Sequence, residues 1–445
     1  MLVIVARRCH VHLPRGDEMA TRLPPPPPST PELAHYASLD ARMCAAVKGT
    51  DLLATVSWPA QAQVDFLAAR GRGAFRFPKI DYPHQDHAAL RAELDAIVAQ
   101  TDASHPLGDY IARTCESWRI ATELFEAMGT PAITEHSIRL FGRPGDRLPG
   151  DGPTNLEAAR HFIDIADEIE RELASAPMPE DIPAEVLQGE LQARLDAFFT
   201  RHRISVLLDP GLIAKAAAGP TRIRLRTTAA FSDYDRQQLL EHEAFVHSLT
   251  ALNGREQPYL KSLARSSPRV TATQEGLATF AEQITGAIDI ARMKRISLRI
   301  IAIDMALHGA NFLDVFAFFV DSGQTDAESF TSAQRVFRGS PLGGGAAFTK
   351  DTVYLHGLLS VHTFFRWALR QGKLPLCRHL FAGKMALQDV LRFEPLFEQG
   401  FIAPPTYLPP WVRKANGLAG MLAFSLFANR IRLDNVDAGE LVLGL

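Results

Sequence analysis

Apolar residues recur every three to four positions along most of the chain from about residue 32 to residue 132. The stretches HAALRAELDAIVAQ (87–100) and YIARTCESWRIATELFEAMG (110–129) show this pattern most clearly, and NLEAARHFIDIADEIERELA (155–174) repeats it further on. This period places apolar side chains along one side of an α-helix. The pattern therefore predicts a helical N-terminal region, which we assign to residues 31–150.

Other stretches depart from this pattern. The run FGRPGDRLPGDGPTN (141–155) is dense in Gly, Pro and Asp, which favour turns, so it is a candidate loop or domain boundary. The runs RISVLLDP (203–210) and TRIRLRTT (221–228) are short and rich in β-branched residues, as β-strands are. The aromatic run FLDVFAFFV (312–320) is typical of buried core. The expected fold class is α+β, mainly α, with a small sheet in a larger domain over residues 151–445.

The composition is that of a globular protein, with 47% hydrophobic and 22% charged residues. Lys and Arg total 47 against 50 Asp and Glu, a net charge of −3, so we expect neither nucleic acid nor a membrane surface as a partner. The stretch ANGLAGMLAFSLFAN (415–429) is shorter than the roughly 18 residues of a membrane-spanning helix. We therefore expect a soluble protein, and the pattern predicts no particular oligomeric state.

The N-terminus and the cysteines bear on the compartment. The opening MLVIVARR lacks the charge-first order and cleavage site of a signal peptide, so we expect a cytoplasmic protein. Five prolines at 24–28 predict a disordered Pro-rich tail over residues 1–30, and Met19 is an alternative start to Met1. No C-x-x-C pair occurs, so we expect reduced structural thiols at all four cysteines, Cys9, Cys44, Cys115 and Cys377.

The first candidate for chemistry is LLEHEAFVHSL (239–249), which is one residue longer than the zinc-peptidase signature H-E-x-x-H. Ser232 with Asp235 predicts the start of its helix, and the Asn-Gly pair at 253–254 predicts the end. In a regular α-helix, the five-residue spacing turns His242 and His247 about 140° apart. A π-bulge or a bend would bring them together. Otherwise the segment is an ordinary helix with a solvated Glu243 and His247 pair.

The second candidate is TATQEGLATFAEQITGA (271–287), in which Glu275 falls near the start of a predicted helix. A capping box between Thr271 and Gln274, or a cap at Thr273, would explain an acid there as helix initiation alone. Gly276 costs about 1 kcal/mol against Ala inside a helix, which favours a close approach of another helix. Taken with the first motif, Glu275 suggests a His, His, Glu zinc site with a glutamate base.

Five blocks in order, LLEHEAFVH, ALNGREQP, QEGLATFAE, RVFRG and FTKDTVYLHGL, resemble the QEGLA-motif family. Its bacterial members are called flavohaemoglobin expression-modulating proteins, and its animal members are microtubule-associated tyrosine carboxypeptidases. The resemblance runs from about residue 35 to the end. It implies a zincin-like metallopeptidase with one Zn²⁺ per chain, held by His242, His247 and Glu275, with Glu243 as general base.

Family members that have been characterised in animals remove a C-terminal tyrosine from α-tubulin. For this chain the resemblance implies a carboxypeptidase acting on a peptide or protein C-terminus, and it leaves the natural substrate open. Two alternatives stay open as well. One is a zinc endopeptidase, and the other is a regulatory protein that binds zinc without cleaving peptides. The intact Glu243 favours an enzyme, since a structural zinc site needs no base.

A carboxypeptidase also needs a cation for the terminal carboxylate and a donor for the developing oxyanion. The stretch RVFRGSPLGGGAAFTKDTVY (335–354) offers Arg335, Arg338 and Lys350 for the first role and Tyr354 for the second. Its glycines at 343–345 suggest either a loop that folds over a substrate or a flexible surface loop. The strand 221–228 is a candidate edge strand for pairing with an extended substrate, or a plain structural strand.

Overall fold

The computed structural model describes residues 30–173, 179–212 and 215–430. The predicted Pro-rich tail therefore lies outside the described residues, except for Thr30. The Thr30 hydroxyl accepts a hydrogen bond from the backbone N–H of Leu33 and so caps the first helix, α1 (Pro31–Ala46).

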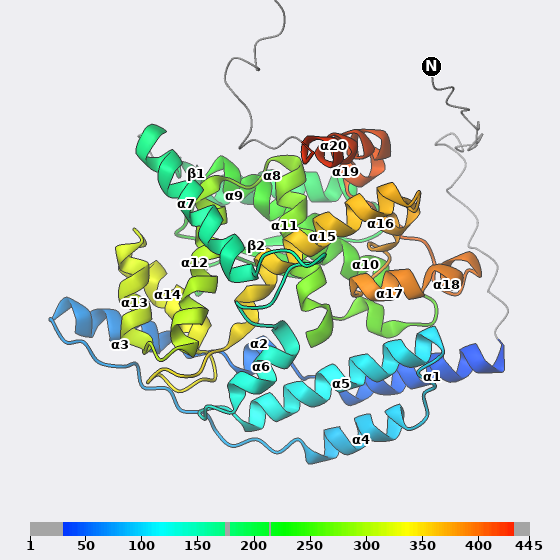
Figure 1. The fold of residues 1–445 in the computed structure, drawn as a ribbon, viewed down its shortest axis with the longest axis horizontal. Coiled ribbons are helices and arrows are strands. Elements are labelled where there is room, and N and C mark those ends of the chain that lie inside the picture. Colours follow the sequence, from blue (N-terminus) through cyan, green and yellow to red (C-terminus); the bar gives the residue numbers. More distant parts are fainter. Residues whose placement is uncertain (1–29, 174–178, 213–214, 431–445) are drawn as a thin grey trace, which may run out of the picture.

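The predicted helices of the N-terminal region are confirmed. After α1 come α2 (Leu52–Thr55), α3 (Ala60–Gly71), α4 (Ala88–Val98), α5 (Pro106–Glu126) and α6 (Ile133–Phe141). Helix α5 is buried along much of its length and packs against α1, α4 and α6. Helices α1, α4 and α5 form one side of the molecule (Figure 1).

The predicted loop over 141–155 is confirmed between α6 and α7 (Asn155–Leu173). Helix α6 ends at Gly142, whose φ of 77° lies in the region that glycine adopts without strain. Leu148 anchors the loop in the same apolar core that contains Phe125 before it and Phe280 after it. The division into domains at residue 150 stays a prediction.

Both predicted strands are confirmed, as β2 (Ser205–Asp209) and β4 (Arg222–Arg226), which pair in parallel. The chain forms a further strand, β3 (Ala216–Gly219), antiparallel to β4, so the order is β2-β4-β3. The prediction that TRIRLRTT is an edge strand is therefore wrong, because β4 is paired on both sides. The sequence AAAG of β3 has low β-propensity, and for that reason we did not predict it.

A second small sheet joins β1 (Ile182–Pro183) to β5 (Ala230–Phe231), and α8 (Ala184–Phe198) follows β1. From there the chain is almost entirely helical. It runs through α9 (Asp233–Gln238), the π-helix η1 (Leu239–Ser248), α10 (Leu249–Arg255), the 3₁₀ turns η2 (Lys261–Ala264) and η3 (Pro268–Val270), α11 (Thr271–Thr285), α12 (Ile290–Leu307), α13 (Phe312–Asp321) and α14 (Asp326–Phe337). The mainly helical fold class is thus confirmed, with two small sheets instead of one.

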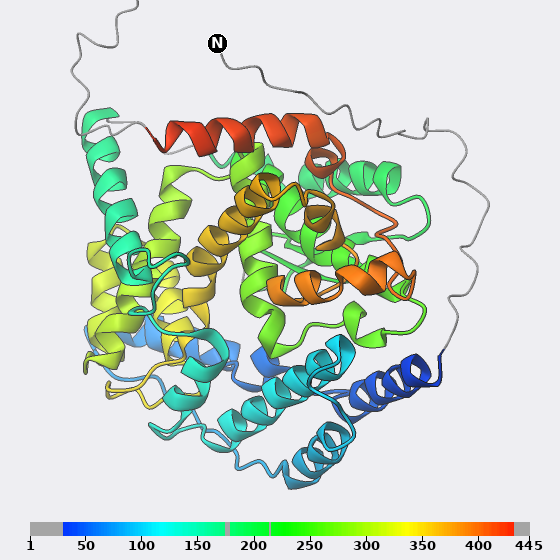
Figure 2. The ribbon, with the colours of Figure 1, turned by 45° about the vertical axis from the view of Figure 1, so that its right-hand side comes forward.

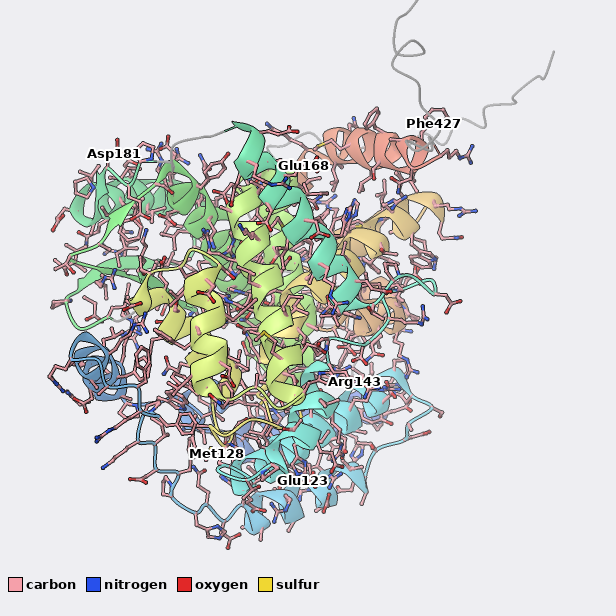
Figure 3. All side chains as sticks on the ribbon, turned by 60° about the vertical axis from the view of Figure 1, so that its left-hand side comes forward. Glu123, Met128, Arg143, Glu168, Asp181 and Phe427 are labelled. Carbon is pink, nitrogen blue, oxygen red and sulfur yellow. The ribbon has the colours of Figure 1, made fainter. Side chains whose placement is uncertain are left out.

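The remaining elements are η4 (Thr349–Thr352), α15 (Val353–Arg370), α16 (Pro375–His379), α17 (Leu387–Arg392), α18 (Glu394–Glu398), α19 (Pro410–Arg413) and α20 (Ala415–Ala428). Helix α20 lies at the surface on the side opposite α1 and α4 (Figures 1 and 2). Phe427, at the outer end of α20 (Figure 3), leaves 63% of its surface exposed. No described helix is both long and apolar enough to cross a membrane.

Three predictions about buried residues are confirmed. In the aromatic run, Phe312, Phe316 and Phe319 of α13 are buried in a core cluster. The cysteines within the described residues, Cys44, Cys115 and Cys377, are buried free thiols, while Cys9 lies outside the described residues. Gly276 of α11 lies against Gly357 of α15, where an added Cβ would stand 2.3 Å from the Gly357 carbonyl carbon. The two glycines let α11 and α15 cross in contact.

Candidate metal centre and active site

The helix that carries the H-E-x-x-x-H motif begins as predicted. Ser232 caps α9, and its hydroxyl accepts from the Asp235 backbone N–H while the Asp235 carboxylate accepts from the Ser232 N–H. The helix then widens into the π-helix Leu239–Ser248. This confirms the predicted π distortion, which extends over ten residues. It excludes the regular α-helix with its two histidines turned apart.

The π-helix brings the two histidines together, because its i to i+5 repeat places His242 and His247 on the same side. Their ring centroids lie 4.8 Å apart, with the rings nearly perpendicular. His242 is buried, while His247 and Glu243 keep 21% and 27% of their side-chain surface exposed. The atoms of His242, Glu243 and His247 that can bind a metal all lie within 4.8 Å of one another, so the three residues form a group that could hold a metal ion.

Glu275 of α11 faces the same pair. Its Oε2 lies 3.6 Å from the Nε2 of His242 and 3.6 Å from the Nε2 of His247, too far for hydrogen bonds. Ligand atoms of a tetrahedral zinc site stand about 3.3–3.6 Å apart, given metal–ligand distances of about 2.0–2.2 Å. The distance from the Glu275 oxygen to each imidazole nitrogen is therefore compatible with a shared zinc ion.

The predicted capping box at the start of α11 is wrong. Thr271 is already the first helical residue, and Val270 precedes it without a side-chain cap. The Gln274 Oε1 accepts from the Thr250 hydroxyl at 3.0 Å. Glu275 thus lies beyond the first turn, so helix initiation does not account for an acid at this position.

A buried ion pair stabilises His242 through its Nδ1 atom. The Nδ1 of His242 lies 2.5 Å from the Oε1 of Glu282, a fully buried carboxylate on α11 that also pairs with Arg292 of α12. Because Glu282 holds a proton on Nδ1, Nε2 is the nitrogen that would lose its proton and offer its lone pair to a metal beside Glu275. We did not predict Glu282. Its sequence signal is an acid seven residues after Glu275, two turns along the same helix, in an otherwise apolar stretch.

The electrostatics of this group favour a positive charge between the histidines. Burial lowers the pKa of His242, but the nearby carboxylates of Glu275, Glu282 and Glu243 outweigh it and raise that pKa to about 10. Burial raises the pKa of Glu275, yet Lys350 and the two histidines hold it well below its usual range. The carboxylates therefore stay ionised and stabilise a cation at this place, as metal ligands do.

The predicted cationic and tyrosine residues gather beside Glu275. The Nζ of Lys350 donates to the Oε1 of Glu275 at 2.7 Å and to the Tyr354 hydroxyl at 3.0 Å. Arg335 forms two bonds of 2.5 and 2.7 Å to Asp351, and its Nη2 lies 3.4 Å from the Tyr354 hydroxyl. The side chain of Arg338 makes no hydrogen bond or ion pair to any residue that the structure describes.

A sequence model of a family described as microtubule-associated tyrosine carboxypeptidase matches residues 65–430. The chain belongs to this family. The resemblance based on the five sequence blocks is thus confirmed, and this tyrosine carboxypeptidase family member is an enzyme with an H-E-x-x-x-H group that can hold a metal. A search of curated proteins finds no match.

In this member of the tyrosine carboxypeptidase family, the Gly-rich loop packs on the body of the protein. An added Cβ on Gly344 would stand 2.2 Å from the carbonyl oxygen of Gly309, just after α12. The backbone N–H of Gly345 donates to the Ala306 carbonyl at 2.8 Å. The loop is thus a fixed connection between α14 and η4 in this structure.

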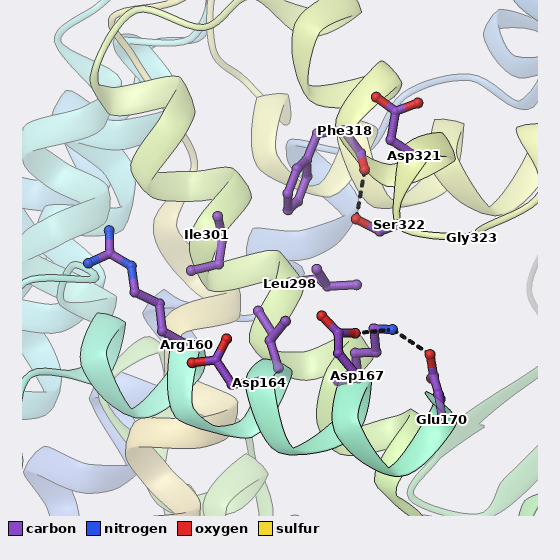
Figure 4. A pocket seen from close by; sticks show the side chains of 12 residues that line it. Arg160, Asp164, Asp167, Glu170, Leu298, Ile301, Phe318, Asp321, Ser322 and Gly323 are labelled. Carbon is purple, nitrogen blue, oxygen red and sulfur yellow. Dashed lines mark hydrogen bonds and ion pairs between the residues drawn. The ribbon is translucent and has the colours of Figure 1, made fainter. Parts of the chain in front are cut away.

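A pocket of this family member lies elsewhere. A cavity of about 600 Å³ opens between α7, α12 and α13, with Leu298, Ile301 and Phe318 on its apolar side (Figure 4). Lys294 in this pocket is paired to Asp167 at 2.6 Å and to Glu170 at 2.8 Å. None of the predicted site residues lines this cavity, so we place the chemistry at the histidine pair and not here.

Proposed function

We propose that the protein is a zinc-dependent carboxypeptidase that removes the C-terminal residue of peptides or proteins in the cytoplasm. The observation that carries this proposal is the π-helix, which brings His242 and His247 within ligand distance of Glu275. One Zn²⁺ per chain would be held in a zincin-like domain. When bound, zinc supplies a Lewis acid that polarises the scissile carbonyl and activates water.

Two carboxylates face the histidines, and we assign them different roles. Glu275 is the third ligand, because its Oε2 lies 3.6 Å from both imidazoles while Lys350 fixes its other oxygen. Glu243 is the general base. Its Oε1 lies 4.0 Å from the Nε2 of His242, and its side chain is partly exposed, so it can face a water molecule.

In the hydrolysis, the carboxylate of Glu243 takes a proton from the attacking water as the water oxygen bonds to the peptide carbonyl carbon. The C–N bond then breaks, and Glu243 returns the proton to the leaving amine. The Tyr354 hydroxyl accepts from Lys350 and faces Arg335, so its own hydrogen is available to donate to the carbonyl oxygen in the transition state.

The cations beside Tyr354 favour a carboxypeptidase over an endopeptidase, since an endopeptidase has no terminal carboxylate to bind. We propose Arg335, Arg338 and Lys350 as the residues that recognise the substrate end, either directly or by positioning other groups. We propose that an extended substrate pairs with the edge strand β3. This strand lies beside the π-helix, because the Gly219 carbonyl at its end accepts a hydrogen bond from the Ser248 hydroxyl at 3.1 Å. The family description suggests an aromatic terminal residue such as tyrosine.

The test compares the purified protein with its Glu243→Gln variant. Bound zinc is measured, and both proteins are incubated with a peptide library that varies the C-terminal residue. We expect about one zinc per chain in both and loss of terminal residues only with the unmodified protein. Zinc without cleavage by either would support a regulatory zinc-binding protein, and cleavage inside peptides would support an endopeptidase.

A further inference from the structure

We infer that Arg299 of α12 and Arg338 at the end of α14 form the subsite that binds the terminal carboxylate of the substrate. This inference rests on the proposed carboxypeptidase function. Nothing in the sequence singled out Arg299. The Nε atoms of both arginines are buried without a hydrogen-bond partner in the described part of the chain.

Three other cations near the metal centre already have carboxylate partners, whereas the buried Lys384 donates to the Ser266 hydroxyl at 3.0 Å instead. Arg292 is paired with Glu282, Lys350 with Glu275 at 2.7 Å, and Arg335 with Asp351 through two bonds. Arg299 lies 3.8 Å from the same Asp351, which is too far for a hydrogen bond. Its guanidinium group is thus in excess, because Arg335 already occupies both oxygens of Asp351.

Arg338 is the second cation in excess. It makes no ion pair with any described residue, and Arg335 is a like charge beside it. Burial and Arg335 lower the pKa of both Arg299 and Arg338 to about 10, so both remain charged at neutral pH. A buried charge that lacks hydrogen bonds to a carboxylate is costly, and an anionic ligand would offset this cost.

The position of Arg299 suits a terminal carboxylate. A continuous set of contacts links it to the metal centre, from Arg299 to Asp351, then to Arg335, to Tyr354 and to Lys350, which holds Glu275. The Arg299 side chain keeps 23% of its surface exposed, so a ligand can reach it. A guanidinium fork matches a carboxylate with two parallel hydrogen bonds.

This arrangement divides the cations into two kinds. Lys350 and Arg335 are positioning residues, because they hold Glu275, Asp351 and Tyr354 in place. Arg299 and Arg338 have free donors and are the groups that contact the substrate. The ligand of this subsite is the C-terminal carboxylate of the peptide substrate. The last peptide bond of the same substrate lies beside Glu243 and Tyr354.

The experiment measures binding instead of turnover. The zinc-loaded Glu243→Gln protein is titrated with a fluorescently labelled peptide ending in tyrosine, once with a free carboxylate and once with a C-terminal amide. We expect the carboxylate peptide to bind about 10- to 100-fold more tightly, as hydrogen bonds to charged groups predict. Adding Arg299→Gln or Arg338→Gln should remove most of this preference. Arg299→Lys should keep part of it, since the charge remains but the fork is lost.

Arg295→Gln is the matched control, because Arg295 lies one turn earlier on α12 and is exposed. It should keep the full preference. An unchanged preference in Arg299→Gln, or equal binding of both peptides to the parent, would overturn the inference. Cleavage of the same peptide by the protein with Glu243 intact is scored separately, so failure of the carboxylate subsite is distinguished from failure of the proposed activity. Thermal unfolding of each variant checks that it is folded.

Discussion

The Nδ1 of His242 and the Oε1 of Glu282 lie 2.5 Å apart, and Glu282 is completely buried. This bond fixes the tautomer and the orientation of the imidazole, and Arg292 balances the charge of the carboxylate. Groups that hydrogen-bond to a metal-binding side chain tune its metal affinity. We therefore predict that Glu282→Gln lowers zinc affinity by about 10- to 100-fold. Competition with a chromophoric chelator measures this change.

The same variant leaves the charge of Arg292 without its carboxylate partner, which costs about 3–5 kcal/mol of unfolding free energy. A double variant, Glu282→Gln with Arg292→Met, separates the two effects. We expect it to recover much of the stability in a urea titration, but not the zinc affinity. Recovery of both would mean that Glu282 acts only through the fold.

The crossing of α11 and α15 gives a second prediction. Gly276 leaves no room for a methyl group, since its added Cβ would stand 2.3 Å from the backbone of Gly357. Gly276→Ala should therefore destabilise the protein by about 3 kcal/mol or more, as severe overpacking does, and displace the neighbouring Glu275. Gly417→Ala in α20 is the control, because its Cβ meets nothing within 4 Å. It should be neutral or stabilising by up to about 1 kcal/mol. A thermal melt in which Gly276→Ala matches this control would contradict the packing argument.

Local sequence signals predicted much of the fold. Periodicity predicted the helices α4, α5 and α7, and the β-branched runs predicted β2 and β4. The strand AAAG was missed because its residues carry no local preference for a strand, and it forms only through pairing with β4. The edge position assigned to β4 was wrong for the same reason.

The candidate site shows the same limit. The five-residue spacing of His242 and His247, read with a resemblance, predicted the π distortion, because the spacing itself sets the geometry. The support of His242 by Glu282 depends on how η1 and α11 meet, and the surplus charge of Arg299 depends on how α12, α14 and η4 meet. These contacts form only in the tertiary structure, so the sequence of one helix does not predict them.

Tyr354 gives a third prediction. If its hydroxyl stabilises the oxyanion, Tyr354→Phe should lower kcat by about 10- to 100-fold, while KM and zinc content change little. Tyr259→Phe is a suitable control, because the Tyr259 ring stacks on Phe401 and its hydroxyl has no hydrogen-bond partner among the described residues. Steady-state kinetics on a peptide that the unmodified protein cleaves provides the measurement. An unchanged kcat would remove Tyr354 from the reaction.

A buried carboxylate far from the histidines predicts how stability depends on pH. Asp40 of α1 accepts from both the backbone N–H and the hydroxyl of Ser262 in η2. Burial raises the pKa of Asp40 from 3.8 to about 6, although the bonds from Ser262 oppose the shift. Because the folded state holds the proton more tightly, this contribution to stability is complete below about pH 4 and is lost as pH rises through about 6.

The variant Asp40→Asn keeps an acceptor for Ser262 and cannot ionise, so it should escape this loss. We predict that Asp40→Asn is more stable than the unmodified protein at pH 8 by roughly 3 kcal/mol, since the pKa of Asp40 is raised by about two units and one unit corresponds to about 1.4 kcal/mol. The gap should shrink towards pH 5, where Asp40 is protonated. Urea titrations of both proteins at pH 5, 6, 7 and 8 measure it. A gap that is constant over this range would show that Asp40 does not titrate near pH 6, and a gap that widens towards pH 5 would reverse the sign of its shift.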